Sequence, residues 1–357
     1  MVLINSMKIT RLLFVVLSLG LLLSACSGAG VASSWPGVSA DQSMAYIANG
    51  TEVYAIRVGD GSQVWQYPEK PDARKPIYTP PVLTADGQLL VGDFDHTLYS
   101  LNPQNGQVNW SFANAKGRWI ASPLVVDQTI YAPCADDSLY ALDLKGNLLW
   151  TFTAGHALWA QPATDGKNLY VSSMDHSLYA VSMKTGQKVW SDDLGGAILG
   201  TPALSSDGIL YVGTLGNEMV AVDSASGKVI WRTTVNGGVW GGPIIKDGNL
   251  YFGDLGGSFY AVDSVKGSIA WQIKPDGPIT ASPLVVNDNL IFPTESGSLV
   301  AVDTKGAIVW NQQIKGNLYS TPVLSGDRVL VGITKGDNTV VALDAKGSQL
   351  WAFVPAK

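Results

Sequence analysis

The sequence predicts an all-β fold, an eight-bladed β-propeller of four-stranded antiparallel blades, from three recurring features. A tryptophan recurs every 39 to 45 residues, and a proline stands 27 to 29 residues before each of these tryptophans. Between the two lie short apolar runs separated by turns that usually contain glycine, as expected for hairpin strands. Four strands every 40 residues are typical of one propeller blade, and neighbouring blades bury the apolar faces that no blade can bury alone.

The recurring tryptophan is expected at the start of the outermost strand of each blade. There the indole lies against the neighbouring blade and covers the turn before it. An aromatic side chain of this size buries about 150 to 250 Å², so this ladder of tryptophans is predicted to hold the blades together. The ladder consists of Trp65, Trp110, Trp150, Trp190, Trp231, Trp271, Trp310 and Trp351. The opening prolines are Pro36, Pro81, Pro123, Pro162, Pro202, Pro243, Pro283 and Pro322.

Residues 1–25 are predicted to be the signal peptide of a lipoprotein, translated from Met1 or Met7. Lys8 and Arg11 form a short positive region, and the apolar run 12–23 is too short for a membrane span. The sequence Leu-Ser-Ala before Cys26 resembles the lipobox of bacterial lipoproteins, which implies that Cys26 is lipidated and becomes the mature N-terminus. The alternative is ordinary secretion with an accidental cysteine.

Residues 26–35 are then the lipidated cysteine and a flexible tether, and residues 36–357 are a single eight-bladed domain. Several acyl chains on Cys26 hold a protein at a membrane better than one chain does. Ser27 rather than Asp follows Cys26. By the rules of lipoproteins, this places the protein in the outer membrane of a cell with two membranes, facing the periplasm, and otherwise on the outer face of the plasma membrane.

Composition argues against nucleic acid as a partner. Without Lys8 and Arg11 the net charge becomes 21 − 29 = −8, and only 15% of residues are charged, whereas nucleic-acid binding needs a basic stripe. With Cys26 lipidated, Cys134 has no partner for a disulfide and is expected to be a buried, inert thiol. The propeller is expected to be monomeric.

The pattern Leu-Tyr-Ala-Val, a turn with glycine and then Trp resembles the repeat of the pyrroloquinoline-quinone-like propellers, as in 178–190. This family includes quinoprotein dehydrogenases and the propeller lipoprotein of the outer-membrane β-barrel assembly machinery. The resemblance covers about residues 36 to 355. The dehydrogenases are much longer and most carry an adjacent cysteine pair and a calcium ion. This chain has no such pair, so no cofactor is expected and the assembly lipoprotein is the better match.

The resemblance also implies a partner contact through loops that lead into blades and carry Arg, Leu and Asp. The comparable connectors, 196–200 and 274–278, keep Leu199 and Asp276 but contain no Arg. No residue of that contact is therefore transferred to this chain. The connector between the first two blades is longer than the others, and its extra residues, 68–76, are charged and rich in proline, which is typical of either an added function or a tolerated surface insertion.

A candidate binding rim is predicted where the connectors enter the central channel. Three places before the opening prolines stand Tyr78, Ile120, Trp159, Leu199, Trp240, Thr280 and Tyr319, with Trp119 one place earlier. Basic residues on the adjoining connectors are Lys70, Arg74, Lys75, Lys116 and Arg118. Exposed tryptophans and a local reversal of charge favour a surface for an anionic or extended ligand. The alternative is that the aromatics plug the channel and the cations are ordinary solvated loop residues.

No catalytic or metal site is expected. The three histidines, His96, His156 and His176, lie on loops of the same face, where turn chemistry explains them, and no nucleophile or phosphate-loop motif is present. The sequence therefore predicts a non-enzymatic, membrane-anchored scaffold that binds a protein partner in the cell envelope, in outer-membrane protein assembly. An extracytoplasmic binder of glycans or small molecules is the alternative, and a quinone-dependent dehydrogenase is third.

Overall fold

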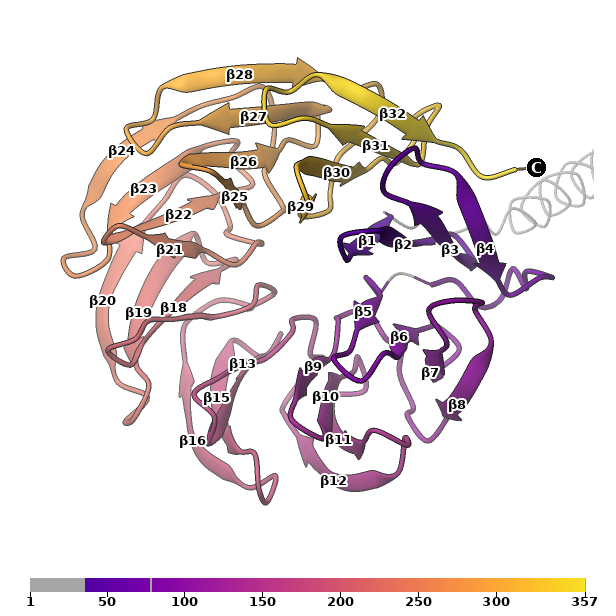
Figure 1. Cartoon of the computed structure of the whole chain (residues 1–357). Coiled ribbons are helices and arrows are strands. Elements are labelled where there is room, and N and C mark those ends of the chain that lie inside the picture. Colours follow the sequence, from indigo (N-terminus) through magenta and orange to yellow (C-terminus); the bar gives the residue numbers. More distant parts are fainter. Residues whose placement is uncertain (1–35, 78, 357) are drawn as a thin grey trace, which may run out of the picture. The chain divides into compact units, whose positions relative to one another are not determined.

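A computed structural model describes residues 36–77 and 79–356. These residues form eight four-stranded antiparallel sheets arranged as the blades of a ring (Figure 1). Every sheet is built from four consecutive strands, and this includes the first and the last sheet. The predicted eight-bladed propeller is confirmed, and the ring closes without exchange of a strand between its ends.

Each blade runs outward from the centre of the ring in chain order. The innermost strands are β1 (Gly37–Ala40), β5 (Val82–Leu83), β9 (Leu124–Val126), β13 (Ala163–Thr164), β17 (Ala203–Leu204), β21 (Ile244–Lys246), β25 (Leu284–Val286) and β29 (Val323–Ser325). The second strands are β2 (Met44–Asn49), β6 (Leu89–Gly92), β10 (Thr129–Pro133), β14 (Asn168–Ser172), β18 (Ile209–Thr214), β22 (Asn249–Gly253), β26 (Asn289–Pro293) and β30 (Arg328–Gly332).

The outer half of each blade holds its third and fourth strands. The third strands are β3 (Glu52–Arg57), β7 (Leu98–Leu101), β11 (Ser138–Asp143), β15 (Ser177–Ser182), β19 (Glu218–Asp223), β23 (Phe259–Asp263), β27 (Ser298–Val302) and β31 (Val340–Leu343). The outermost strands are β4 (Gln63–Tyr67), β8 (Val108–Phe112), β12 (Leu148–Thr153), β16 (Lys188–Asp193), β20 (Val229–Thr234), β24 (Ile269–Ile273), β28 (Ile308–Gln313) and β32 (Gln349–Phe353).

The hydrophobic core is divided into eight clusters, each between two adjacent blades. The second and third strands are buried on both faces, because each blade is covered by a neighbour on either side. Tyr211 of β18 and Leu250 of β22, for example, are buried in one cluster. This explains why these strands read as continuous apolar runs rather than as alternating polar and apolar residues. Stability therefore depends on contacts between blades.

The ladder tryptophans join each blade to the next. Each is the third residue of its outermost strand, and its indole Nε1 donates a hydrogen bond to a backbone carbonyl of the following blade at 2.9–3.1 Å. Trp351 closes the ring through the carbonyl of Val58. The turn that the indole covers thus belongs to the following blade, and the expectation that it covers the turn of its own blade was wrong.

A glycine in each covered turn makes this contact possible. A Cβ built on Gly267 would lie 2.7 Å from Cδ2 of Trp231, and the φ of Gly267 is +70°. The same arrangement recurs in all eight turns, at 2.5–2.9 Å from the preceding blade's indole and with φ between +69° and +87°. Only glycine combines this backbone conformation with so close an approach. The turn glycine and the tryptophan are therefore one structural unit.

Some sequence expectations concern residues that the structure does not describe. The predicted signal peptide, Cys26, the tether and Trp35 lie before residue 36, and Tyr78 lies between the two described ranges. Within 36–77 and 79–356, no helix is long and apolar enough to cross a membrane.

Candidate functional site

The connectors between blades and the turns between second and third strands form one face of the ring, the connector face. The backbone N–H of Trp119, in the connector to the third blade, donates to the carbonyl of Asp93 in a turn of the second blade at 3.1 Å. The carbonyl of the adjacent Arg118 accepts from the N–H of Ala135, in a turn of the third blade, at 3.0 Å. Each such connector is held between the turns of two blades, so the loops of this face are fixed.

Aspartates reinforce the connector face. The Asp136 carboxylate accepts hydrogen bonds from the Lys116 backbone N–H and the Tyr140 hydroxyl, both at 2.7 Å. Burial works to raise the pKa of Asp136, but these hydrogen bonds outweigh it and the pKa is lowered. Asp254 of the sixth blade is fully buried and accepts in the same way from the Gly237 N–H and a tyrosine hydroxyl. These carboxylates hold connectors in place.

A central cavity of about 410 Å³ lies where the innermost strands of all eight blades meet. The segments that enter the innermost strands of the third to eighth blades each contribute two recurring positions to its wall, and the first two blades contribute Val38 and Pro80. The positions three places before the opening proline form an inner ring, composed of Ile120, Trp159, Leu199, Trp240, Thr280 and Tyr319. The positions directly before that proline form a polar ring, composed of Ser122, Gln161, Thr201, Ser282 and Thr321, with Gly242 in the sixth blade.

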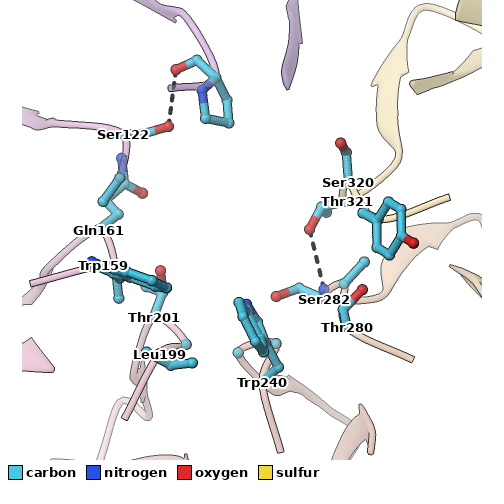
Figure 2. A pocket seen from close by; sticks show the side chains of 18 of the residues that line it. Ser122, Trp159, Gln161, Leu199, Thr201, Trp240, Thr280, Ser282, Ser320 and Thr321 are labelled. Atoms are coloured by element: carbon cyan, nitrogen blue, oxygen red, sulfur yellow. Dashed lines mark hydrogen bonds between the residues drawn. The ribbon is translucent and has the colours of Figure 1, made fainter. Parts of the chain in front are cut away.

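Figure 2 shows how these side chains surround the opening. The indoles of Trp159 and Trp240 project toward it, Ser122 and Gln161 lie on one side, and Ser282 and Thr321 lie on the other. Of the predicted aromatic rim, Trp159, Trp240 and Tyr319 thus line the central cavity. They narrow the opening without filling it. Tyr78 lies outside the described residues.

Trp119 does not belong to this site, and its placement at the rim was wrong. Its side chain is only 1% exposed and packs between the second and third blades, with ring centroids 6.4 Å from Phe112 and 5.7 Å from Tyr140. Its equivalents in the other connectors are all apolar and buried, namely Ile77, Leu158, Ile198, Val239, Ile279 and Leu318. This position is a plug between blades, one residue before the position that faces the cavity.

The five basic residues do not form a uniform positive surface. Arg74 pairs with Asp72 at 2.7 Å, and Lys75 pairs with Asp95 at 3.1 Å. The guanidinium of Arg118 lies over the ring of Phe94, 5.0 Å from its centroid. In the described part of the chain, Lys70, Lys116 and Arg118 make no ion pair. Of the five basic residues, only these three thus contribute an unpaired positive charge to this region.

His96 and His176 lie in turns, and Cys134 lies in the core. His96 and His176 occupy equivalent turn positions with φ of +69° and +75°, which Asp137 and Asn217 fill in other blades. No group of three or more metal-binding side chains occurs in residues 36–77 and 79–356. Cys134 is fully buried, and burial raises the pKa of its thiol to about 12.

The two connectors singled out by family resemblance also have structural roles. Leu199 lines the cavity and is 5% exposed, and Asp276 accepts hydrogen bonds from the hydroxyls of Thr294 and Ser298 at 2.8 and 2.7 Å. The polar ring was missed by sequence reasoning. Its signal was present, because Ser, Thr or Gln directly precedes the opening proline in five of the six repeats from Ser122 to Thr321, and Gly242 is the exception.

Solved structures share the fold. BamB from Moraxella catarrhalis superposes with a TM-score of 0.72 at 16% identity, covering 86% of this chain and 93% of that one. The computationally designed protein Ika8 gives 0.76 at 15% identity over 87% and 96% of the two chains. A europium-containing methanol dehydrogenase gives 0.68 at 15% identity over 84% and 82%. These likenesses show the propeller fold alone.

Curated relatives match shorter stretches. The chain is 24% identical over 138 residues to tetrathionate hydrolase of Acidithiobacillus ferrooxidans, which is 31% of this chain and 28% of that protein. It is 26% identical over 132 residues to outer membrane protein assembly factor BamB of Legionella pneumophila (strain Paris), which is 37% of this chain and 33% of that protein. The matched stretches therefore span about a third of these relatives or less.

A family model provides the widest sequence match. The model is described as outer membrane protein assembly factor BamB, and it matches residues 49–197, 174–306 and 275–357. Together these overlapping matches run through all eight blades. The chain therefore belongs to the family of outer membrane protein assembly factor BamB.

Proposed function

We propose that this protein is a non-enzymatic scaffold of the cell envelope, which binds a protein partner during outer-membrane protein assembly. The family match from residue 49 to residue 357 carries this proposal. We further propose that the propeller is tethered by lipid to the outer membrane and faces the periplasm. The lipobox-like sequence before Cys26 supports this anchor.

The connector face is suited to bind a protein. Its loops are tied to neighbouring turns by backbone hydrogen bonds, such as Ala135 to Arg118, and by buried carboxylates such as Asp254. A surface that is already ordered loses little conformational entropy on association.

We place the partner contact on the connectors that enter the second and third blades. Lys116 and Arg118 are exposed there, and Arg118 is held over the ring of Phe94. An arginine stacked on an aromatic ring is pre-oriented for a carboxylate and is a side chain favoured at protein interfaces. The rest of the chain is acidic. An acidic segment of a partner would therefore be attracted to this region and repelled elsewhere.

Affinity purification of the full-length lipidated protein from its own membranes tests this proposal. Subunits of the barrel-assembly machinery should copurify with the parent protein and be lost from the double variant Lys116→Glu with Arg118→Glu. Lys145→Glu is the matched control, because Lys145 lies in the turn between β11 and β12, away from the connector face. If no assembly subunit copurifies with the parent, the proposed function is wrong. If the double variant retains them, only the contact surface is wrong.

The membrane anchor is tested separately. Cys26→Ala should release the protein from the membrane fraction into the soluble extract while leaving the thermal unfolding of the propeller unchanged. A Cys26→Ala protein that remains membrane-bound would contradict the lipid anchor.

A further inference from the structure

The central cavity has the size and the wall of a small-molecule site. Its volume of about 410 Å³ falls within the range of roughly 300 to 1,000 Å³ that is usual for such sites. The wall is also rigid, because the segments that form it pack backbone against backbone. A Cβ built on Gly241 would lie 2.7 Å from the carbonyl carbon of Ala281, and one on Gly200 would lie 2.8 Å from the backbone N of Gly242. The cavity is thus preformed.

The two tryptophans that line the cavity differ from those of the ladder. All eight ladder indoles donate their Nε1–H to a carbonyl of the next blade. Trp159 Nε1 is buried and has no hydrogen-bond partner among the described residues, and neither Trp159 nor Trp240 belongs to the ladder. Both side chains are partly exposed and project toward the opening (Figure 2). Their flat faces are available to a ligand and are not needed to join blades.

The polar ring supplies oriented hydrogen-bonding groups. The Ser122 hydroxyl donates to the Pro80 carbonyl at 3.0 Å, so its oxygen lone pairs remain to accept from a ligand. The Thr321 hydroxyl oxygen accepts from the Ser282 backbone N–H at 3.2 Å, so its O–H remains to donate (Figure 2). The Gln161 amide nitrogen donates to the Pro123 carbonyl at 2.8 Å, which fixes the amide and leaves its oxygen as an acceptor.

The ligand that suits this wall carries no charge. No Asp, Glu, Lys, Arg or His belongs to the described lining of the cavity. Glu295 acts on the lining residue Tyr319, whose pKa is raised by burial and then by this carboxylate. A charged group inside the cavity would lose hydration without gaining a counter-ion, and an anion would also be repelled by Glu295.

From these observations we propose that the central cavity binds a neutral sugar, with one face of a pyranose ring stacked on Trp159 or Trp240. The C–H groups on that face carry partial positive charge and are attracted to the negative face of an indole. The sugar hydroxyls, each a donor and an acceptor, match the mixed donors and acceptors of the polar ring. This site is independent of the lipid anchor and of the partner contact proposed above.

Isothermal titration of the full mature propeller with maltose, cellobiose and N,N′-diacetylchitobiose tests the proposal, with galacturonic acid as the anionic control. At least one neutral sugar should bind saturably, and galacturonic acid should not. Trp240→Ala should weaken that binding about tenfold, since an aromatic contact contributes roughly this much. Thr201→Val removes a hydroxyl of the polar ring at nearly constant shape and should also weaken it. Both variants should still copurify the assembly subunits.

Three results would overturn the inference. The first is that no neutral sugar binds, and the second is that galacturonic acid binds as well as the neutral sugars. The third is that folded Trp240→Ala and Thr201→Val proteins bind the sugar as tightly as the parent. If Trp240→Ala fails to fold, Trp240→Phe and Thr201→Val decide the outcome, because they preserve most of the packing. None of these results bears on partner capture.

Discussion

Replacement of a ladder tryptophan is expected to destabilise the propeller strongly. Trp231 is partly exposed, contacts Tyr211 with ring centroids 5.9 Å apart, and donates to the Ser264 carbonyl at 3.1 Å. Truncation of a large aromatic side chain costs about 3 to 5 kcal/mol, and the lost hydrogen bond contributes about 1 kcal/mol of that sum. Trp231→Ala should therefore lower the free energy of unfolding by about 3 to 5 kcal/mol, measured by urea denaturation followed by circular dichroism.

The turn glycine offers a sharper form of this prediction. Gly267→Ala forces a non-glycine residue to φ of +70° and places a methyl group against Trp231. The backbone conformation alone costs about 1 to 2 kcal/mol, and the steric clash adds to it. In the Trp231→Ala background the clash with the indole is absent, and what remains is the backbone cost and the close approach to Thr233 Oγ1, which lies 3.0 Å from the same Cβ. The double variant should therefore be less destabilised than the sum of the two single variants.

Two results would refute this reasoning. A Trp231→Ala protein that unfolds at the same urea concentration as the parent would show that the ladder does not hold the blades. Strict additivity of Trp231→Ala and Gly267→Ala would show that the indole and the turn glycine do not act as one unit. A matched control is Val265→Ala, because Val265 lies in the same turn with 74% of its surface exposed and should change stability little.

Three further predictions concern single residues. Trp119→Ala should lower the unfolding free energy by about 3 to 5 kcal/mol, whereas Trp240→Ala should leave the urea midpoint nearly unchanged; equal midpoints would contradict the core position of Trp119. Cys134, whose pKa is raised to about 12 by burial, should resist alkylation by iodoacetamide at pH 8 and react once urea unfolds the chain; rapid labelling of the native protein would contradict this. The folded-state pKa of Asp136 is lowered from 3.8, so its contribution to stability is present above about pH 4 and is lost as pH falls through the folded pKa. Asp136→Asn should accordingly make stability fall less steeply as the pH drops below about 4, and an unchanged slope would show that this carboxylate does not stabilise the connector.

The fold could be predicted because each blade repeats the same physical problem. A tryptophan, a turn glycine and an opening proline recur at nearly fixed offsets. Each of the three residues has the same packing role in every blade. The partner of each indole was harder to predict, because the covered turn lies in the following blade. Trp351 and Val58, for example, are 293 residues apart in the chain. Periodicity indicates that a contact recurs but not which neighbouring blade receives it.

The candidate site was only partly predictable. Trp119 was misplaced by one residue, although the sequence contained the signal that separates the two positions. The position of Trp119 is apolar in every connector, as in Leu158 and Ile279, whereas the next position varies from Trp159 to Thr280. An always apolar position belongs to the core, and a variable one belongs to the cavity wall. The ion pair between Lys75 and Asp95 could not be foreseen, because it joins a connector to a turn 20 residues later.

The contact between Trp351 and Val58 has a consequence for how the ring is closed. It repeats the indole-to-carbonyl bond and the glycine approach, at Gly61, that join every other pair of blades. The junction where the last blade meets the first is therefore no weaker in kind than the other seven. A circular permutant whose chain is opened at another connector and joined across this junction would keep all eight indole–glycine contacts, so the blade at which the chain starts would become arbitrary.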